Sequence, residues 1–468
     1  MSARSAVRRR LAIAVAIAAA LFSSASVAAA LLDREIRDAL AGALPGDKLS
    51  VVVSFANASG PLTASQNNLL RAIGIRQALT FRSLPIAGAL ATPAQIRALA
   101  ARDDVLSIYA NRDLRYFNAE ARQLTRVAEA QASPGDFGQA LPYIGRGVTA
   151  VINDSGIDAT HADLAYGSHV VQNVQALTNL NSLVAALPVT YIENQVDTDI
   201  SSGHGTHCAG SFGGSGARSG GRYAGVAPGA SIVGYGSGAV ISILDAIGGF
   251  DYAIHNKYRF GAPIRVISNS WGTSGDFEPL DPVNLASYAA YKHDIVVLFA
   301  AGNDGPGADT HNPYAQAPWV ISVAAGTKDP ALALADFSSR GNPGESGSFT
   351  MPDGQNWTYV NAPTVVAPGV DIVSTRALTG LLPVLALPQD LSLTPQHVPF
   401  YTHMSGTSMA TPHAAGVVAL LLEANPTLLP ADVRKALQLG AVPMSGHAGW
   451  EVGAGYLDAY AALQIVTQ

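Results

Sequence analysis

The sequence predicts an α/β protein in which a doubly wound, mostly parallel sheet has helices on both faces, preceded by a small α+β unit. From residue 144 onward, short and almost continuously apolar segments alternate with helical candidates. Parallel strands that are covered on both faces are apolar throughout, and alternation of strands with helices is the pattern of a parallel sheet. With 468 residues, 48% of them hydrophobic and 13% charged, the chain can bury a large core.

The N-terminus has the pattern of a secretory signal peptide. Three arginines at positions 8–10 precede an apolar run at 11–22, and small residues then lead to alanines at 28–30, an A-x-A cleavage pattern. We expect residues 1–30 to be removed and the protein to be secreted and extracellular. An uncleaved membrane anchor is the alternative, but the apolar run is short for a membrane span.

Charge and cysteine content exclude some classes of protein. Four of the 28 lysines and arginines lie in the signal, so 24 basic residues face 34 acidic residues afterwards, a net charge of −10. Such a chain lacks the basic surface that nucleic-acid binding requires. Cys208 is the only cysteine, so no intramolecular disulfide forms and stability must come from the core or from bound ions.

Residues 31–117 read as a small βαββαβ-like unit. The expected elements are a strand at 49–56, a helix at 65–74, two strand segments within 78–93, a helix at 93–104 and a strand at 105–117. The polar stretch at 118–143 reads as a linker.

Residues 144–468 carry the α/β pattern. We expect strands at 147–153, 230–236, 264–271, 294–303 and 319–326, with helices at 240–256 and 282–294. Segments 342–363 and 378–399 fit this pattern poorly and are interpreted as surface insertions.

Three polar residues stand where a doubly wound sheet gathers its reactive groups, just beyond the carboxyl ends of strands and at the first turns of helices. Asp154 ends an apolar strand, His204 opens "HGTHCAG", and Ser408 precedes a long apolar helix. Each alone is commonly a cap or a hydrogen-bonding group. Together they offer an orienting carboxylate, a base and a nucleophile, which acyl transfer by a hydroxyl requires.

The helix that contains His204 is expected to begin after two serines. Ser201 and Ser202 would supply the helix cap. Gly205 would allow a close backbone approach.

The segments "DSGID", "HGTHCAG" and "GTSMATPHAAG", in the chain order Asp, His, Ser, resemble the three signatures of the subtilisin-like serine proteases. "FAAGNDG" resembles that family's oxyanion motif. The resemblance covers roughly residues 144–463, and the preceding unit is similar to the family's inhibitory, chaperone-like propeptide with a ferredoxin-like fold. It implies a secreted serine endopeptidase made as an autoprocessed zymogen. The implied organisation is a signal at 1–30, a propeptide at 31–117, a linker with the start of the mature chain at 118–143, and a peptidase domain at 144–468.

The resemblance assigns roles to individual residues. Ser408 would attack the scissile carbonyl, His204 would take its proton, and Asp154 would hold the imidazolium. Asn303 would donate its side-chain amide to the oxyanion, together with the backbone N–H of Ser408 at the start of its helix. Pro412 should remove the helical hydrogen bond to the Ser408 carbonyl and distort the first turn.

The resemblance also implies two segments that bind substrate by pairing with an extended peptide as an added strand. Their small residues suggest a roomy, apolar pocket, whereas tight packing is the structural alternative. The residues are Ser270, Trp271, Gly272, Ala300, Ala301 and Gly302.

Two residues raise further expectations. Asn153 stands where family members usually carry an aliphatic residue, and we expect it to alter the hydrogen bonding of Asp154. Cys208 lies on the same helix face as His204 and matches the cysteine of thiol-containing members of the family. It is favoured as a small buried filler, and a mercurial bound to it would disturb His204.

The metal site is left unknown, and no cofactor is expected for catalysis. His204 and His207 lack the glutamate of an HExxH zinc helix, so a metallopeptidase is disfavoured. Asp163 matches a position where some family members bind calcium, but the loop at 211–223 lacks Asn or Asp oxygens. Structural calcium stays open as an option. The acidic residues Asp276, Glu278 and Asp281 read as a solvated loop.

The expected partners are protein or peptide substrates and the chain's own propeptide. No nucleic acid, and no membrane after removal of the signal, is expected, and the enzyme should be monomeric. The rival from another class is a non-catalytic binding protein on the same scaffold. The complete set of Asp154, His204, Ser408 and Asn303 argues against that rival.

Overall fold

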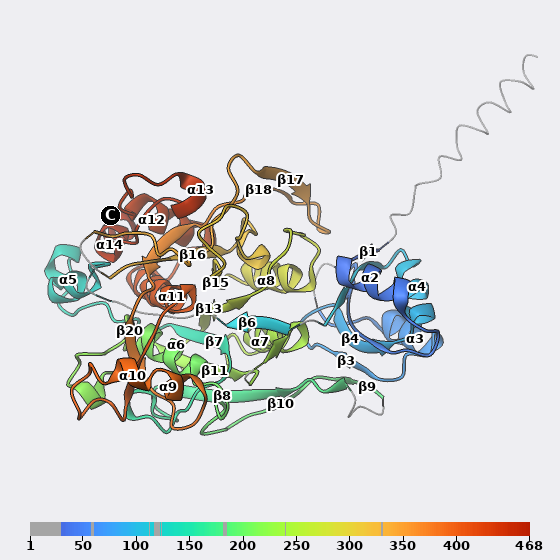
Figure 1. Ribbon diagram of the computed structural model, residues 1–468, viewed down its shortest axis with the longest axis horizontal. Coiled ribbons are helices and arrows are strands. Elements are labelled where there is room, and N and C mark those ends of the chain that lie inside the picture. The colour runs from blue at the N-terminus through green and yellow to red at the C-terminus, as the bar shows by residue number, and fades with distance from the viewer. Residues whose placement is uncertain are drawn as a thin grey trace, which may run out of the picture.

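The computed structural model describes residues 30–57, 60–111, 113–116, 122, 124–180, 185–238, 240–328 and 331–468. The expected signal peptide therefore lies outside the described residues, apart from Ala30. Figure 1 shows a small N-terminal unit beside a larger domain. None of the helices in the described ranges is long and apolar enough to cross a membrane.

The N-terminal unit contains the strands and helices expected at 49–104, and it begins with a short strand and a helix that were not expected. The expected strand at 105–117 is split in two, so that its second half leaves this unit. The elements are β1 (Leu31–Leu32), α2 (Arg34–Gly42), β2 (Leu49–Phe55), α3 (Ala64–Ala72), β3 (Ala78–Thr80), β4 (Ile86–Ala91), α4 (Pro93–Ala100), β5 (Val105–Ala110) and β6 (Asp113–Tyr116).

Local sequence explains the two central helices of this unit. Thr63 and Gln66 form a capping box at the start of α3, and Thr92 and Gln95 form another at the start of α4. The sheet has the order β1-β5-β2-β4-β3-β9, and its outer strand β9 (Ala186–Pro188) comes from the larger domain. The two units therefore share one sheet.

The larger domain is built on an eight-stranded sheet of order β10-β8-β11-β7-β13-β15-β16-β19. All neighbouring strands in it are parallel except β10, which pairs antiparallel with β8. The strands are β7 (Thr149–Asp154), β8 (Val170–Leu177), β10 (Thr190–Ile192), β11 (Ser231–Gly236), β13 (Ile264–Asn269), β15 (Val296–Ala300), β16 (Ile321–Gly326) and β19 (Val365–Pro368).

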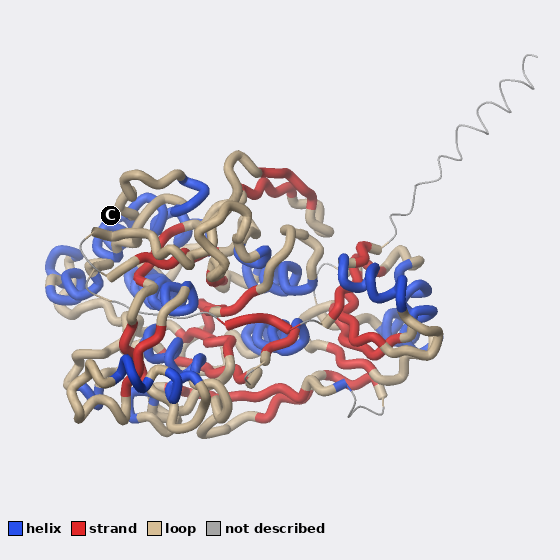
Figure 2. The backbone as a smooth tube through the Cα atoms, viewed as in Figure 1, coloured by secondary structure: helices blue, strands red, loops and turns tan. Residues whose placement is uncertain are grey.

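Helices cover both faces of this sheet, as expected (Figure 2). In β7, Ala150 and Ile152 join the core on the side of α6 and α11, whereas Val151 joins the core on the side of α7 and α8. This alternation explains why the strand is apolar throughout. The helices are α6 (His204–Gly213), α7 (Ile243–His255), α8 (Pro282–Lys292), α11 (Thr407–Ala424), α12 (Pro430–Gly440), α13 (Gly449–Val452) and α14 (Ala459–Thr467).

Part of the expected linker at 118–143 is instead packed structure. Residues Val127–Ala132 form α5, and Val127 and Ala130 are buried in the core of the larger domain. These two apolar residues are three positions apart and therefore share one helix face. The few apolar residues in a polar stretch were a weak signal for a helix.

The two expected insertions lie outside the eight-stranded sheet. The first contains the hairpin of β17 (Ser346–Thr350) and β18 (Asn356–Val360). The second contains the short helices α9 (Leu382–Leu385) and α10 (Leu387–Asp390). It connects β20 (Ile372–Thr375) to β21 (Tyr401–Met404), which leads directly to α11.

His413 links α11 to the segment before α5. Its ring Nε2 lies 2.7 Å from the Thr125 hydroxyl oxygen, and its side chain is buried. Burial, helped by the positive charge of Arg122, lowers the pKa of His413 to about 3. An unfolded chain would protonate this imidazole below about pH 6.5. The neutral native form therefore loses stability as the pH falls from about 6.5 towards 3.

The variant His413→Gln keeps a hydrogen-bonding group but removes this titration. Its free energy of unfolding should fall less steeply than that of the parent between pH 6 and pH 4, by about 1.4 kcal/mol per pH unit. Denaturant unfolding at several pH values measures both slopes. Parallel slopes would show that His413 is not held neutral in the folded protein.

Candidate active site

Asp154 and His204 meet at the edge of the sheet. Asp154 is the last residue of β7 and His204 the first of α6, and both side chains are fully buried. The Nδ1 atom of His204 lies 2.6 Å from Oδ1 of Asp154, and this oxygen also accepts the Ser155 N–H at 2.8 Å. Because an ionised carboxylate only accepts, Nδ1 carries the hydrogen and Nε2 is the basic nitrogen.

The start of α6 is organised by a residue that the sequence analysis missed. The residue at the cap position is Gly203 in a left-handed conformation, with φ of 86°, while the hydroxyl of Ser202 accepts the His204 N–H at 3.4 Å. The buried Asp199 accepts the Gly203 N–H at 2.9 Å and binds Thr206 through its N–H at 3.0 Å and its hydroxyl at 2.7 Å. A carboxylate is favourable at the positive end of a helix. An acidic residue shortly before the helix start was the only signal in the sequence.

Gly205 makes the close approach that was expected of it. A Cβ atom at this position would lie 2.2 Å from the carbonyl oxygen of Gly156. The Gly205 N–H donates to the Ser155 hydroxyl at 2.8 Å. The absence of a side chain therefore lets α6 lie against the turn that follows Asp154.

Ser408 lies in the first turn of α11 and is fully buried. Its carbonyl oxygen has no helical donor because Pro412 lacks an N–H, as expected. Ser270 fills the gap: its hydroxyl donates to the Ser408 carbonyl at 2.7 Å, and the Cys208 thiol lies 3.5 Å from the same oxygen. The Ser408 hydroxyl in turn donates to the Ser270 carbonyl at 2.6 Å. The irregular first turn is thus locked to the end of β13.

Cys208 lies between the two halves of the site. Its sulfur is 3.6 Å from Nδ1 of His204 and 3.5 Å from the carbonyl oxygen of Ser408. Burial raises the pKa of the thiol well above its usual value, so Cys208 is uncharged at neutral pH. The structure thus joins Asp154 to His204 directly and places Ser408 across Cys208 from them, with the Ser408 hydroxyl hydrogen directed at Ser270.

Asn303 is oriented by the residue before Ser408. Its Oδ1 atom accepts the Thr407 N–H at 2.9 Å and the Thr407 hydroxyl at 3.0 Å. With Oδ1 held by Thr407, the amide NH₂ is directed away from the helix. Asn303 is half-buried. This orientation suits a donor to an oxyanion beside the N-terminus of α11.

The segment that was expected to bind an extended peptide is paired with a strand of the same chain. β14 (Trp271–Gly272) pairs antiparallel with β6, with Trp271 opposite Tyr116 and Gly272 opposite Arg115. On its other edge, β6 pairs antiparallel with β12 (Ile241–Ser242). β6 is therefore the central strand of a three-stranded sheet whose outer strands belong to the larger domain.

The second expected substrate segment, at 300–302, is tied to the first by Asn312, which the sequence analysis missed. The Asn312 amide donates to the carbonyls of Trp271 at 3.2 Å and Ala300 at 2.8 Å. The Asn312 N–H donates to the Ala301 carbonyl at 2.8 Å. Gly302 has φ of 111° and donates its N–H to the Thr407 hydroxyl. Ala300, Ala301 and Gly302 are buried, and these polar contacts tie them to Trp271 and Thr407.

Asn153 does not act on Asp154 in the way that was expected. Its amide donates to the Ala246 carbonyl at 3.0 Å and to the Asn269 side chain at 2.9 Å. Successive side chains of a strand point to opposite faces, so Asn153 points away from the Asp154 carboxylate.

The side chains considered as metal ligands have protein partners. Asp163 accepts the Arg218 N–H at 3.0 Å and the Tyr401 hydroxyl at 2.7 Å, one on each oxygen. Each oxygen of the Asp163 carboxylate therefore has a protein donor. Nε2 of His207 lies 3.1 Å from the Thr402 carbonyl. Asp281 is buried and caps α8, so it does not belong to a solvated loop.

Within the described parts of the chain, one group of three potential metal-binding side chains lies close together. It consists of Asp154, His204 and Cys208, whose ligand atoms are all within 4.8 Å of one another. Within this group, Nδ1 of His204 and Oδ1 of Asp154 are in direct contact at 2.6 Å.

Comparison with known proteins identifies the family of this chain. Residues 145–456 match the model of the subtilase family. The chain belongs to the subtilase family. Serine protease AprX of Bacillus subtilis (strain 168) is 31% identical over 376 residues, which cover 77% of this chain and 75% of AprX. A subtilisin of Bacillus sp. (strain TA39) is 30% identical over 68% of this chain and 66% of its own length.

Solved structures show the same fold as this subtilase. Fervidolysin from Fervidobacterium pennivorans, described as a keratinolytic enzyme related to subtilisin, superimposes with a TM-score of 0.60 at 21% identity. That match covers 93% of this subtilase and 63% of the fervidolysin chain, so it includes the N-terminal unit. Sphericase matches with a TM-score of 0.53 at 26% identity over 71% of this chain and 96% of its own.

Replacing Gly205 with alanine should separate α6 from the turn after Asp154, because the new methyl group would meet backbone. We expect a loss of about 1–3 kcal/mol in the free energy of unfolding together with reduced turnover. Gly261→Ala is the matched control, since nothing lies within 4 Å of a Cβ there. Denaturant unfolding and peptide hydrolysis measure the two effects. Equal behaviour of both variants would contradict the close approach.

Replacing Asn303 with leucine removes the amide donor. We expect kcat to fall about 10²- to 10³-fold with little change in KM, measured with a peptidyl anilide. Thr407→Val is the control, because it loosens the orientation of Asn303 but keeps the NH₂ group, and its loss should be much smaller. Comparable losses in both variants would mean that Asn303 serves structure alone.

Proposed function

We propose that this subtilase is a secreted serine endopeptidase that hydrolyses peptide bonds in proteins through Ser408, His204 and Asp154, and that it is made as an autoprocessed zymogen. The single observation that carries the proposal is the pairing of β6 with two strands of the larger domain. This strand of the N-terminal unit lies between β12 and β14, and β14 directly follows Ser270, the residue bonded to Ser408.

The geometry supports a two-step acyl transfer. The Ser408 oxygen, once rotated away from the Ser270 carbonyl, attacks the scissile carbonyl and gives its proton to Nε2 of His204. The imidazolium then protonates the departing amine, and water hydrolyses the resulting ester by the reverse proton path. Asp154 stabilises the imidazolium through its 2.6 Å contact with Nδ1.

The negative charge that develops on the carbonyl oxygen needs donors that are already in place. The Ser408 N–H is in the first turn of α11, where backbone donors have no helical partner. The Asn303 amide is oriented by Thr407 towards the same side. Together these donors would form the oxyanion hole. We propose that no cofactor takes part in this chemistry.

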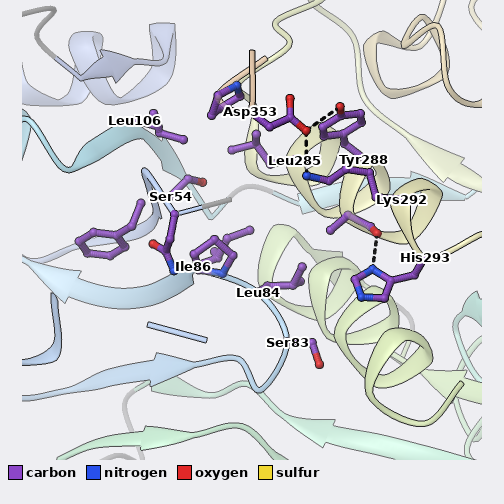
Figure 3. Close-up of a pocket in the computed structure, with 15 residues that line it drawn as sticks. Ser54, Ser83, Leu84, Ile86, Leu106, Leu285, Tyr288, Lys292, His293 and Asp353 are labelled. Atoms are coloured by element: carbon purple, nitrogen blue, oxygen red, sulfur yellow. Dashed lines mark hydrogen bonds and ion pairs between the residues drawn. The ribbon is translucent and has the colours of Figure 1, made fainter. Parts of the chain in front are cut away.

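The interface of the N-terminal unit supports its role as an inhibitory propeptide. Asp251 on α7 accepts the Ser83 N–H at 2.6 Å, and Asn111 accepts the Leu244 N–H at 2.9 Å. On the same interface, the strands of the unit face α8 across a cavity of only about 50 Å³ (Figure 3). The interface is therefore close-packed and hydrogen-bonded, as a bound inhibitor requires.

The pairing of β6 also suggests where maturation occurs. Trp271 is opposite Tyr116, the last residue of β6, and Ser270, which is hydrogen-bonded to Ser408, directly precedes Trp271. We propose that the bond between residues 117 and 118, one position beyond the described strand, is cut. The partners of the matured enzyme would be protein or peptide substrates, and it would act as a monomer outside the cell.

The variant Ser408→Ala should accumulate as an unprocessed chain, because it lacks the attacking oxygen. The parent should mature to a chain that begins at residue 118, and it should be labelled by a fluorophosphonate while the variant is not. Intact mass, N-terminal sequencing and labelling measure these outcomes. Equal trimming of variant and parent would contradict self-cleavage, and an unlabelled mature parent would indicate a binding protein.

A further inference from the structure

The second insertion carries an unusual concentration of exposed aliphatic side chains. Within residues 378–391, six large aliphatic side chains are between 41% and 78% exposed. Single exposed apolar residues are normal, but a contiguous group marks an interaction site. We call this group the apolar ledge; it consists of Leu378, Leu381, Val384, Leu385, Leu387 and Leu391.

The apolar ledge is fixed to the segment that precedes His204. The backbone N–H groups of Leu381 and Leu382 donate to the carbonyls of Ser201 and Ser202 at 3.2 and 3.1 Å. Pro383 packs so closely on Gly203 that a Cβ there would lie 2.6 Å from the proline ring. Because consecutive Cα atoms are about 3.8 Å apart, the ledge begins on the order of 10 Å from His204.

The other end of the ledge is held by a buried carboxylate. Asp390 is fully buried and pairs with Arg376 at 2.6 Å. It also accepts from the Thr402 hydroxyl at 2.8 Å and the His403 N–H at 2.7 Å, both on β21. Asp390 is the only Asp, Glu, Lys or Arg among residues 378–399. The exposed part of the ledge is therefore uncharged, which favours an apolar occupant over a charged one.

The insertion that carries the ledge lies near the chain that follows β6. Arg122 and Leu124, which follow the proposed cut, line a cavity of about 590 Å³ together with Ser392 and Leu393 of the same insertion. In Figure 1, the β6 arrow points towards the side of the molecule that carries α9 and α10. If the bond between residues 117 and 118 is cut, the chain on its carboxyl side therefore leads to the cavity that the insertion lines.

We propose that the apolar ledge binds apolar side chains of a polypeptide substrate on the carboxyl side of the scissile bond. This inference rests on the proposed function and names its preferred substrates: chains with large apolar residues after the cut. Burial of leucine side chains against such residues removes apolar surface from water on both partners. The rigid attachment of the ledge to the residues before His204 would then hold the leaving segment in register with the base.

The experiment compares three substrates with the same residues before the cut. One is a peptidyl anilide with no residue after it, one is a quenched fluorescent peptide with two leucines after it, and one has two serines there. The test variant Leu378→Ser, Leu381→Ser, Leu385→Ser is compared with the parent, both as matured enzymes. Leu385→Ser and Leu439→Ser form a matched pair, since both leucines are 64% exposed and Leu439 lies on α12.

The triple variant should lose about three- to tenfold in kcat/KM on the leucine peptide and less than twofold on the anilide and the serine peptide. Leu385→Ser should show part of this loss and Leu439→Ser none. Equal losses on all three substrates, or none, would overturn the proposal. The proposal would also be overturned if the parent, but not the triple variant, sedimented as a dimer or bound neutral phosphatidylcholine vesicles. A parent that fails to cleave even the anilide would instead refute the proposed function.

Discussion

The contact between Asp154 and His204 is the constraint on which the rest of the structure depends. It joins the end of β7 to the start of α6 at 2.6 Å in an interior that water does not reach. A buried carboxylate is stable only when donors surround it. The Asp154 carboxylate accepts from Nδ1 of His204 and from the Ser155 N–H. The Ser155 hydroxyl in turn accepts the Gly205 N–H and donates to Asp199, which holds α6 against the turn after β7.

A second constraint comes from Pro412, which makes the first turn of α11 irregular. The Ser408 carbonyl must find a donor outside the helix, and Ser270 provides it at the end of β13. This bond connects Ser408 to the strand that continues into β14, where β6 is paired. One continuous piece of chain therefore joins the first turn of α11 to the strand that holds part of the N-terminal unit.

The N-terminal unit and the insertion at 378–399 approach this site from different sides. The unit supplies β6, packs on α7 and α8, and shares a sheet with the larger domain through β9. The insertion is anchored to the residues before His204 and to β21. The unit is thus attached next to Ser270, and the insertion is attached next to His204.

The sequence by itself indicated the alternation of strands and helices and five strands of the large sheet, β7, β11, β13, β15 and β16, because local periodicity encodes them. Short motifs singled out four candidate residues, Asp154, His204, Ser408 and Asn303. The close backbone approach at Gly205 was also predictable from the sequence, since only glycine permits it. Asp199, Asn312 and the packing of α5 were decided by the tertiary structure. Their partners are distant in the chain or hidden in polar loops, and a hydrogen bond across the fold leaves no local pattern. The sequence therefore specified which groups could react, and the long-range contacts decided how they are held.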